Sequence, residues 1–413
     1  MPSVVFVAPY SLESTLRFVR AAAALPEVTL GIVTQEEPGG WTQRLEASAV
    51  REIAGCVRVG NALDADQLEA GIRQLAPDLG GRVDAVIGIL EPLQETLGVV
   101  RERMGIRGMD ASEARNFRDK AHMKDLLRAA DLPCARHCLA TSAEQALAFA
   151  QELLPLVAKP PAGAGAVDTF RVDTVDQLQD WTRRHAPSAE RPLLLEEFIQ
   201  GEEFSFDTIS VGGQHVFHSI STYAPTPLRV METPWIQWTV MLPRDISGSE
   251  YDPIRHAGPA ALSTLGMQSG MSHMEWFRRE DGTIAISEVG ARPPGAQITS
   301  LLSYAHDRDF YSAWAEVNIF ERFDPPERKY ATGAAYLRGQ GDGRVVQVDG
   351  IEAIQRELGD LVVEAKLPQQ GQAKASSYEG EGYVILRHTD SDVVADGLRE
   401  VVSKLQVRMG NRS

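Results

Sequence analysis

The sequence has few cysteines, a deficit of positive charge and no long apolar run, and each shortage excludes a class of protein. Its 413 residues include only three cysteines, Cys56, Cys134 and Cys138, without the paired spacing of a zinc site or a disulfide framework. Lysine and arginine total 41 against 57 acidic residues, and the formal net charge of −16 repels nucleic-acid phosphates and anionic lipid. No apolar run approaches the ~20 residues of a transmembrane helix, and residues 1–7 lack the features of a secretory signal. We therefore expect a soluble cytoplasmic protein that binds neither nucleic acid nor membranes.

The N-terminal third alternates apolar strands with amphipathic helices, but its first strand–helix turn has no glycine. Strands are predicted at 4–8, 28–34 and 83–88, and helices at 12–25 and 93–104. This alternation is typical of βαβ units in a Rossmann-like parallel sheet. The turn at residues 8–11 lacks the glycines that let a backbone approach a pyrophosphate, so an NAD or FAD site is disfavoured.

The length exceeds that of one compact core, and changes in pattern divide the chain into four regions. The first region is Rossmann-like, and the second contains a glycine-rich loop. The third is rich in strand signals with hairpin turns, and the fourth looks like a small α+β unit. We predict a multidomain protein of mixed α/β and α+β class. Its predicted domains are residues 1–110, 111–200, 201–330 and 331–413.

The segment 272–288 predicts a β-hairpin that places two carboxylates opposite each other. Asp281-Gly282 between two strand-like runs is a strong signal for a two-residue type I′ turn. The register that follows from this turn pairs Glu275 with Glu288, with Cβ atoms roughly 4.5–5.5 Å apart. Like charges this close are destabilising unless a cation lies between them, and carboxylates are suited to Mg²⁺. The alternative is a solvated surface hairpin with an ordinary glutamate pair.

Side chains alternate along a strand, so other groups are expected on the face of this glutamate pair. If no bulge intervenes, His273, Gly290 and Arg292 share that face. Arg292 has the planar fork that holds a carboxylate or a phosphate. His273 is either a functional group or a packed, hydrogen-bonded residue.

Two lysines and a glycine-rich loop suggest a second, phosphate-binding element. Lys159 closes an apolar strand, where an ammonium group is costly unless it is paired. The chain then enters a loop that contains Gly163 and Gly165, whose backbone N–H groups suit phosphate oxygens. Lys120 stands at the head of a predicted helix at 121–130. Taken singly, each of these features is as readily a solvated lysine or a plain surface loop.

The end of the strand at 193–196 carries two carboxylates that suit a nucleoside. Glu196 and the exposed backbone after it would present hydrogen-bonding groups to an adenine edge, and Glu203 would reach ribose hydroxyls. The alternative is a strand end that simply turns at Gly201.

Taken in order, these segments resemble the ATP-grasp superfamily over nearly the whole chain. Within it, the chain looks most like the carboxylate–amine ligases, in particular the L-amino-acid (dipeptide) ligases. The resemblance implies an ATP-grasp fold with an N-terminal Rossmann-like domain that lacks a dinucleotide fingerprint. The segments that carry it are Arg118-Asp119-Lys120 with Leu132-Pro133, 157–160 with Gly163 and Gly165, 195–205, 270–275, 287–295, 333–337 and 380–384.

The resemblance also implies a role for each candidate residue. Glu275 and Glu288 would bind Mg²⁺, for which Mn²⁺ can substitute. Arg292, with the backbone at Gly295, would orient the carboxylate substrate and stabilise an acyl phosphate, and His273 would help to deprotonate an amine. The residues implied to bind ATP are Lys120, Lys159, Gly163, Gly165, Glu196, Glu197, Phe198, Ile199 and Glu203.

The chain departs from the family pattern at two positions. Gly290 stands where the family usually has an asparagine that ligates metal, which leaves one of the two usual Mg²⁺ ions less well held. Ala166 stands where a serine is common, which removes one hydroxyl near the phosphates. Neither change removes a charge, so we expect an active enzyme.

The implied reaction is ATP-dependent, ADP-forming amide-bond formation between a carboxylate, such as an amino acid, and an amine. One alternative is a bicarbonate-activating enzyme like biotin carboxylase, which has a similar nucleotide site. Another is a non-catalytic ATP-binding regulator, which Gly290 keeps open. The stretch Tyr223–Trp238 either lines the substrate pocket or merely covers the sheet. The expected partners are the small-molecule carboxylate and amine, and a second copy of the chain, since similar proteins are commonly homodimers.

Overall fold

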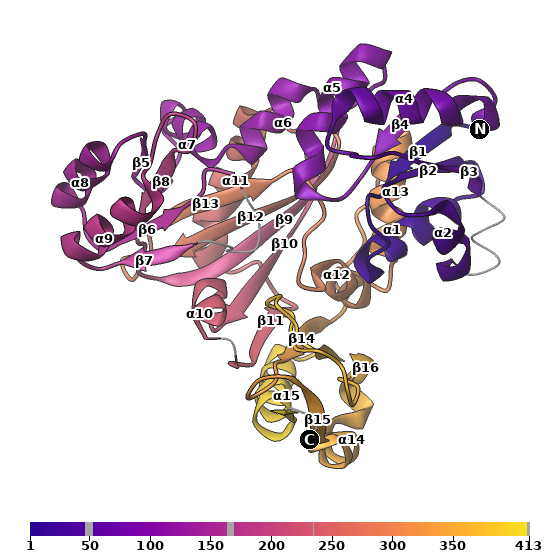
Figure 1. The fold of residues 1–413 in the computed structure, drawn as a ribbon. Coiled ribbons are helices and arrows are strands. Elements are labelled where there is room, and N and C mark those ends of the chain that lie inside the picture. The colour runs from indigo at the N-terminus through magenta and orange to yellow at the C-terminus, as the bar shows by residue number, and fades with distance from the viewer. Residues whose placement is uncertain (46–52, 163–168, 234, 411–413) are drawn as a thin grey trace.

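The computed structural model describes residues 1–45, 53–162, 169–233 and 235–410 (Figure 1). The predicted loop residues Gly163 and Gly165 lie outside these ranges. Within the described ranges, no helix combines the length and the apolar character that crossing a membrane requires. The three cysteines are free, as expected for isolated thiols.

The N-terminal region contains the predicted parallel sheet, with strand order β3-β2-β1-β4. All residues of β1 are buried, as a strand covered by helices on both faces requires. The strands are β1 (Ser3–Val7), β2 (Thr29–Thr34), β3 (Ile53–Arg58) and β4 (Ala85–Ile87). The helices are α1 (Glu13–Ala23), α2 (Pro38–Arg44), α4 (Ala65–Leu75) and α5 (Gln94–Met104), with 3₁₀ turns η1 (Ala76–Leu79) and η2 (Glu91–Leu93).

A four-stranded antiparallel sheet, which we call the small sheet, follows two connecting helices. Asp119 caps the second of these helices, because its carboxylate accepts the backbone N–H groups of Ala121 and His122. The connecting helices are α6 (Ala111–Arg118) and α7 (Lys120–Ala129). The small sheet has the order β5-β8-β6-β7, with β5 (His137–Ala140), β6 (Leu156–Lys159), β7 (Phe170–Val172) and β8 (Leu193–Glu197), and its helices are α8 (Ala143–Glu152) and α9 (Val175–His185).

An eight-stranded antiparallel sheet, which we call the large sheet, forms the centre of the molecule (Figure 1). Its strand order is β13-β12-β9-β10-β11-β14-β17-β16. Its first five strands in chain order are β9 (Glu202–Val211), β10 (Gln214–Ala224), β11 (Trp238–Leu242), β12 (Gly270–Arg278) and β13 (Ile284–Gly290). The helices of this part are α10 (Pro227–Glu232), α11 (Asp252–Leu265), α12 (Ile298–His306) and α13 (Phe310–Phe320), with the 3₁₀ turn η3 (Ser249–Tyr251).

The C-terminal region continues the large sheet. Strand β14 pairs with β11, so one hydrogen-bonded sheet crosses the domain boundary predicted at residue 330. The elements here are β14 (Ala331–Leu337), β16 (Val362–Lys366) and β17 (Gly382–His388) in the large sheet, a separate pair of β15 (Arg344–Asp349) and β18 (Gln406–Gly410), the helices α14 (Ile351–Leu358) and α15 (Ser391–Lys404), and the 3₁₀ turn η4 (Gly359–Leu361).

The N-terminal region is fixed to the large sheet through α1 and α13. Phe18 of α1 packs edge-on against Trp314 of α13, with 5.0 Å between ring centroids. Arg17 of α1 also forms an ion pair with Glu364 of β16. These contacts hold the N-terminal region where its turn η2 reaches the large sheet.

The two hairpin turns predicted from sequence behave differently. At Gly212-Gly213, both residues have positive φ, so β9 and β10 are joined by the expected two-residue turn. At Asp281-Gly282 the prediction was wrong, because only Gly282 has positive φ and Arg279 pairs with Thr283 across a three-residue loop.

Candidate active site

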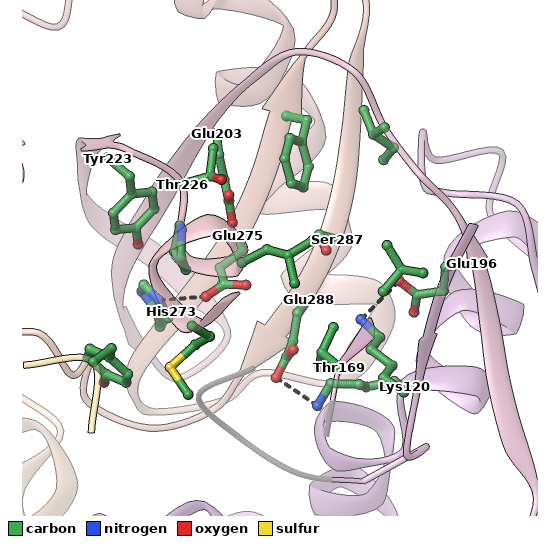
Figure 2. A pocket seen from close by; sticks show the side chains of 18 of the residues that line it. Lys120, Thr169, Glu196, Glu203, Tyr223, Thr226, His273, Glu275, Ser287 and Glu288 are labelled. Carbon is green, nitrogen blue, oxygen red and sulfur yellow. Dashed lines mark ion pairs between the residues drawn. The ribbon is translucent and has the colours of Figure 1, made fainter. Parts of the chain in front are cut away.

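A cavity of about 310 Å³ lies where the small sheet meets the large sheet (Figure 2). Strands β6 and β8 of the small sheet contribute to its lining, as do β9, β12 and β13 of the large sheet. The cavity collects all of the predicted site residues that lie in the described ranges. These are Lys120, Lys159, Glu196, Glu197, Phe198, Ile199, Glu203, His273, Glu275, Glu288, Arg292 and Gly295.

The predicted glutamate pair is confirmed, although the turn beside it differs from the prediction. Glu275 of β12 lies directly opposite Glu288 of β13. The three-residue turn shifts the register near the loop by one residue, and a bulge at Ser287 shifts it back. Two deviations therefore cancel, and the carboxylates face each other as the two-residue turn implied. The bulge also brings Ser287 into the cavity lining beside Glu288.

Lys120 meets this pair from helix α7. Its Nζ lies 2.9 Å from Glu288 Oε1, an ion pair that Figure 2 marks with a dashed line. Lys120 is the first residue of the helix, and its backbone N–H donates to the carbonyl oxygen of Pro161. Helix α7, the segment after β6 and strand β13 therefore converge at one point, where an ammonium group faces a carboxylate.

A buried ionic cluster stands beside this pair. Glu196 Oε2 lies 2.9 Å from Lys159 Nζ, and Oε1 lies 2.9 Å from Lys124 Nζ. Burial alone would raise the pKa of the Glu196 carboxyl, but the two ammonium groups lower it to about 2. Burial would likewise lower the pKa of Lys159, but Glu196 and Glu288 raise it. Both oxygens of Glu196 are thus engaged by lysines, and its contact with an adenine amino group stays a prediction.

Lys124 is a site residue that the sequence analysis missed. It is fully buried, and it also donates to the backbone carbonyl of Ser287. Burial lowers the pKa of Lys124. The available signal was its spacing, because Lys120 and Lys124 are one turn apart on the same helix face. A lysine on the buried face of a helix needs an acid partner, and Glu196 is that partner.

The segment after β8 has its side chains turned to other partners. Glu197 pairs with Arg279 of the hairpin at 3.0 Å, and the guanidinium of Arg171 lies over the Phe198 ring. Ile199 is buried beside them. The backbone N–H groups of Glu197 and Phe198 donate to the carbonyl oxygens of Arg136 and Pro155, and the adenine contacts of this segment stay predictions.

Glu203 is the second residue of strand β9 and is almost completely buried. Burial and the nearby charge of Glu275 raise its pKa well above the usual range. A carboxyl group that is costly to ionise gains from hydrogen-bond donors, which ribose hydroxyls would supply. Its predicted ribose contact stays a prediction.

His273 is held between two carboxylates on the large sheet. Its Nδ1 lies 2.6 Å from Asp207 Oδ1, and its Nε2 lies 3.8 Å from Glu275 Oε1. Burial would lower the pKa of His273, but Asp207 and Glu275 raise it to about 9. Its predicted role in deprotonating an amine stays a prediction. Asp207 was not identified from the sequence.

Arg292 is oriented by an acid from the N-terminal region. Glu91, the first residue of η2, is buried, and its Oε2 accepts from Arg292 Nε at 2.8 Å. Arg292 also donates to the carbonyl oxygen of Pro293 at 2.8 Å. The sequence alone offered no signal for Glu91, because its partner is 201 residues away.

The Glu91–Arg292 pair gives a physical reason for the glycine at position 290. A Cβ atom at Gly290 would lie 3.2 Å from Glu91 Oε2 and 3.6 Å from Arg292 Cγ. An asparagine there would crowd the ion pair before it reached a metal. The position that departs from the family pattern is therefore where Glu91 approaches the large sheet.

The stretch Tyr223–Trp238 does line the cavity. Tyr223 and Thr226 lie on the side of His273 and Glu275, away from Lys120 and Glu196 (Figure 2). Helix α10 and the ring of Trp238 extend this wall. Tyr378, from the connection between β16 and β17, completes it and was not identified from the sequence.

Comparison with known proteins matches part of the chain with a known domain family. Residues 153–300 match the ATP-grasp domain. The chain is 24% identical over 246 residues to an L-arginine-specific L-amino acid ligase of Bacillus subtilis. That match covers 58% of this chain and 59% of the relative, so the chain spans less than two thirds of the relative's length.

Two solved structures show the same fold over the whole chain. The crystal structure of an L-amino acid ligase from Bacillus licheniformis has a TM-score of 0.77 at 20% identity, covering 100% of this chain and 99% of that one. The biotin carboxylase domain of the Hydrogenobacter thermophilus 2-oxoglutarate carboxylase, solved with MgADP, has a TM-score of 0.67 at 16% identity, covering 98% and 90%. At these identities the likeness concerns the fold.

Proposed function

We propose, from the ATP-grasp domain and fold that this chain carries, that it is an ADP-forming ligase that joins a carboxylate to an amine. The observation that supports this most is one cavity in which Lys120 and Lys159 approach the Glu275–Glu288 pair, with Arg292 beside it. Similarity to L-amino acid ligases makes an amino acid the first carboxylate to test.

The donor set of the glutamate pair fits Mg²⁺. Glu275 and Glu288 supply hard oxygen ligands on adjacent strands. Across the described ranges, no group of three or more His, Cys, Asp or Glu residues is placed to hold a metal ion by itself. Mg²⁺ would therefore take its other ligands from phosphate and water, which is its usual mode in phosphoryl-transfer enzymes. Bound there, Mg²⁺ or Mn²⁺ would neutralise charge on the phosphates.

Other residues around the glutamate pair bind and orient the nucleotide. Lys120 and Lys159 hold phosphate oxygens, and Glu196 with Lys124 fixes the position of Lys159. The backbone of residues 197–199 receives the adenine, and Glu203 receives the ribose. These are fixed charges and dipoles, so their contribution is positioning and electrostatic stabilisation.

The reaction runs in two displacements. A carboxylate oxygen of the substrate attacks the γ-phosphorus of ATP, the bond to ADP breaks, and an acyl phosphate forms. The amine nitrogen then attacks the acyl carbon, the bond to phosphate oxygen breaks, and the nitrogen loses a proton. Arg292, oriented by Glu91, holds the carboxylate and then the acyl phosphate.

The test is ATP consumption with Mg²⁺ against pooled amino acids and other small carboxylates, with ADP resolved from AMP and products sought by mass spectrometry. We expect ADP, phosphate and a condensed product only when a carboxylate and an amine are both present. Glu288→Gln should lower turnover by about 10³-fold, whereas Glu280→Gln, which changes an exposed glutamate in the same hairpin, should leave turnover unchanged. AMP release contradicts the proposal. ADP release stimulated by bicarbonate and biotin alone favours a carboxylase, and ATP binding without turnover favours a regulator.

A further inference from the structure

The cavity has a second end that is built from uncharged side chains. We call it the aromatic end, and it lies beyond Glu275 and Arg292. Its residues come from the end of β10, from α10, from the start of β11 and α12, and from the connection before β17. They are Tyr223, Leu228, Met231, Trp238, Ile298 and Tyr378.

The aromatic side chains at this end form a rigid wall. Trp238 stacks on Tyr336 with 4.5 Å between ring centroids, and its Nε1 donates to the carbonyl oxygen of Tyr378 at 2.7 Å. The Tyr223 and Tyr378 rings flank it, at 6.2 Å and 5.7 Å from the Trp238 centroid. The polar atom of Trp238 is thus satisfied within the protein. Trp238 is itself buried, so it supports a wall whose half-buried rings are those of Tyr223 and Tyr378.

Tyr378 connects this wall to the carboxylate-binding position. A Cβ atom at Gly295 would lie 2.6 Å from the Tyr378 hydroxyl oxygen, so the tyrosine occupies the space above that glycine. Burial, followed by the charge of Glu379, raises the pKa of Tyr378 to about 12, so the phenol is neutral. A substrate whose carboxylate reaches Arg292 therefore has the uncharged ring of Tyr378 beside it.

His273, Glu275 and Arg292 lie between the two ends, and the other charged groups of the lining are at the opposite end, which we call the charged end. Its charged groups already have partners, as in the pairs Lys120–Glu288 and Lys159–Glu196. The acid nearest to Tyr378 in the sequence, Glu379, is not part of the lining and accepts from Gln297 at 3.1 Å. A cationic or anionic substituent at the aromatic end would lose water without gaining an opposite charge.

We infer that the carboxylate substrate carries a bulky, uncharged, apolar side chain, of the size of leucine, methionine or phenylalanine. This inference rests on the proposed function. It separates this chain from the L-arginine-specific relative, because no acid is among the six side chains of the aromatic end. Since each buried methylene favours binding, leucine should bind roughly 10-fold or more tightly than alanine.

The first test is calorimetric binding to the wild-type chain with Mg²⁺ and a non-hydrolysable ATP analogue. The probes are leucine, phenylalanine, alanine, arginine and aspartate. We expect leucine and phenylalanine to bind at least 10-fold more tightly than arginine or aspartate. Equal or tighter binding of arginine or aspartate overturns the inference, and so does absence of binding by all five probes.

The second test places a carboxylate in the aromatic end. Met231→Glu should weaken leucine binding by roughly 10-fold and strengthen arginine binding by a similar factor, because the new acid pairs with the guanidinium. Met231→Leu keeps the site apolar and should retain the wild-type order. Arg229→Glu places an acid on the exposed face of the same helix and should change neither affinity. Unchanged affinities in Met231→Glu contradict the inference.

These measurements separate a failure of the inference from a failure of the proposed function. If apolar amino acids bind but no ADP is released, the apolar site is supported and the ligase function is contradicted. If only charged amino acids support ADP release, the ligase function is supported and the apolar site is contradicted.

Discussion

The two ends of the cavity are built on opposite principles. The charged end contains ion pairs in which nearly every group has a fixed partner, such as Glu196 between Lys124 and Lys159. The aromatic end contains stacked rings and aliphatic side chains, such as Trp238 on Tyr336. The charged end suits phosphate and metal chemistry that any carboxylate activation needs, while the aromatic end suits one class of side chain. Reaction and specificity are therefore expected to respond to different substitutions.

The largest expected effect is at the glutamate pair. Glu275→Gln and Glu288→Gln should each lower kcat for ADP release by about 10³-fold, because each removes half of the anionic charge at the metal position. The double variant should be no worse than either single variant, since residues that act as a unit are not additive. Met231→Leu, at the aromatic end, should change kcat by less than about threefold. Comparable losses of kcat from substitutions at both ends would contradict the separation of reaction from specificity.

The buried cluster should show the largest effect on stability. Lys124→Met should lower the free energy of unfolding by about 3 kcal/mol, because it removes one partner from a buried charge. Arg128→Met, an exposed residue on the same helix, serves as the control and should cost less than about 0.5 kcal/mol. Denaturant unfolding measures both. Equal stability of the two variants would mean that the cluster is not a unit of the fold.

The same cluster predicts a pH dependence of stability. The folded-state pKa of Glu196 is about 2, below the 4.5 of an ordinary glutamate. The ionised Glu196 therefore contributes about 3 kcal/mol to the free energy of unfolding above pH 4.5. This contribution is lost as the pH falls from 4.5 towards 2. The stability difference between the wild-type chain and Glu196→Gln should shrink over that window in unfolding experiments at constant ionic strength. A difference that stays constant would contradict the buried ion pairs.

A smaller effect is expected where the two ends meet. Glu91→Gln removes the charge that orients Arg292 and should raise the KM for the carboxylate by about 10-fold. The KM for ATP should stay within about twofold, because Glu91 does not line the nucleotide-binding part. Steady-state kinetics with each substrate varied in turn gives both values. An equal change in both constants would place Arg292 in nucleotide binding instead.

The smallest effect concerns the missing asparagine. Gly290→Asn would restore the family pattern, but its side chain would crowd Glu91. We expect turnover to fall by about fivefold, and we expect no decrease in the Mg²⁺ concentration needed for half-maximal activity. If Gly290→Asn instead raised turnover and lowered the Mg²⁺ concentration needed for half-maximal activity, the glycine would be shown to weaken metal binding. The asparagine would then be shown to leave Glu91 undisturbed.

The sequence revealed the charged end because its residues lie in short segments. Glu275 and Glu288 are close in the chain, and their pairing follows from strand register. Even there, the predicted turn was one residue too short, and the pairing is restored only by the bulge at Ser287. Turn type and bulges depend on packing against the neighbouring strand β9, which local sequence does not specify.

The aromatic end was predicted only in part, through the stretch Tyr223–Trp238, and Glu91 was not predicted, because distant segments complete both places. Tyr378 reaches the cavity from a connection that follows β16, and Glu91 reaches Arg292 from the N-terminal region. The continuous large sheet across residue 330 has the same origin, since β14 pairs with a strand far back in the chain. The predicted domain boundaries stay predictions, as do the individual ligand contacts.

The most direct measurement follows the oxygen atoms of the substrate carboxylate. Leucine labelled with ¹⁸O in its carboxylate is incubated with ATP, Mg²⁺ and an amine-bearing amino acid, and the label is located by mass spectrometry. We expect one ¹⁸O atom in the released inorganic phosphate, with ADP and the condensed product in equal amounts, because the acyl phosphate leaves its bridging oxygen on phosphorus. Label in AMP, or phosphate without label, would contradict an acyl-phosphate ligase.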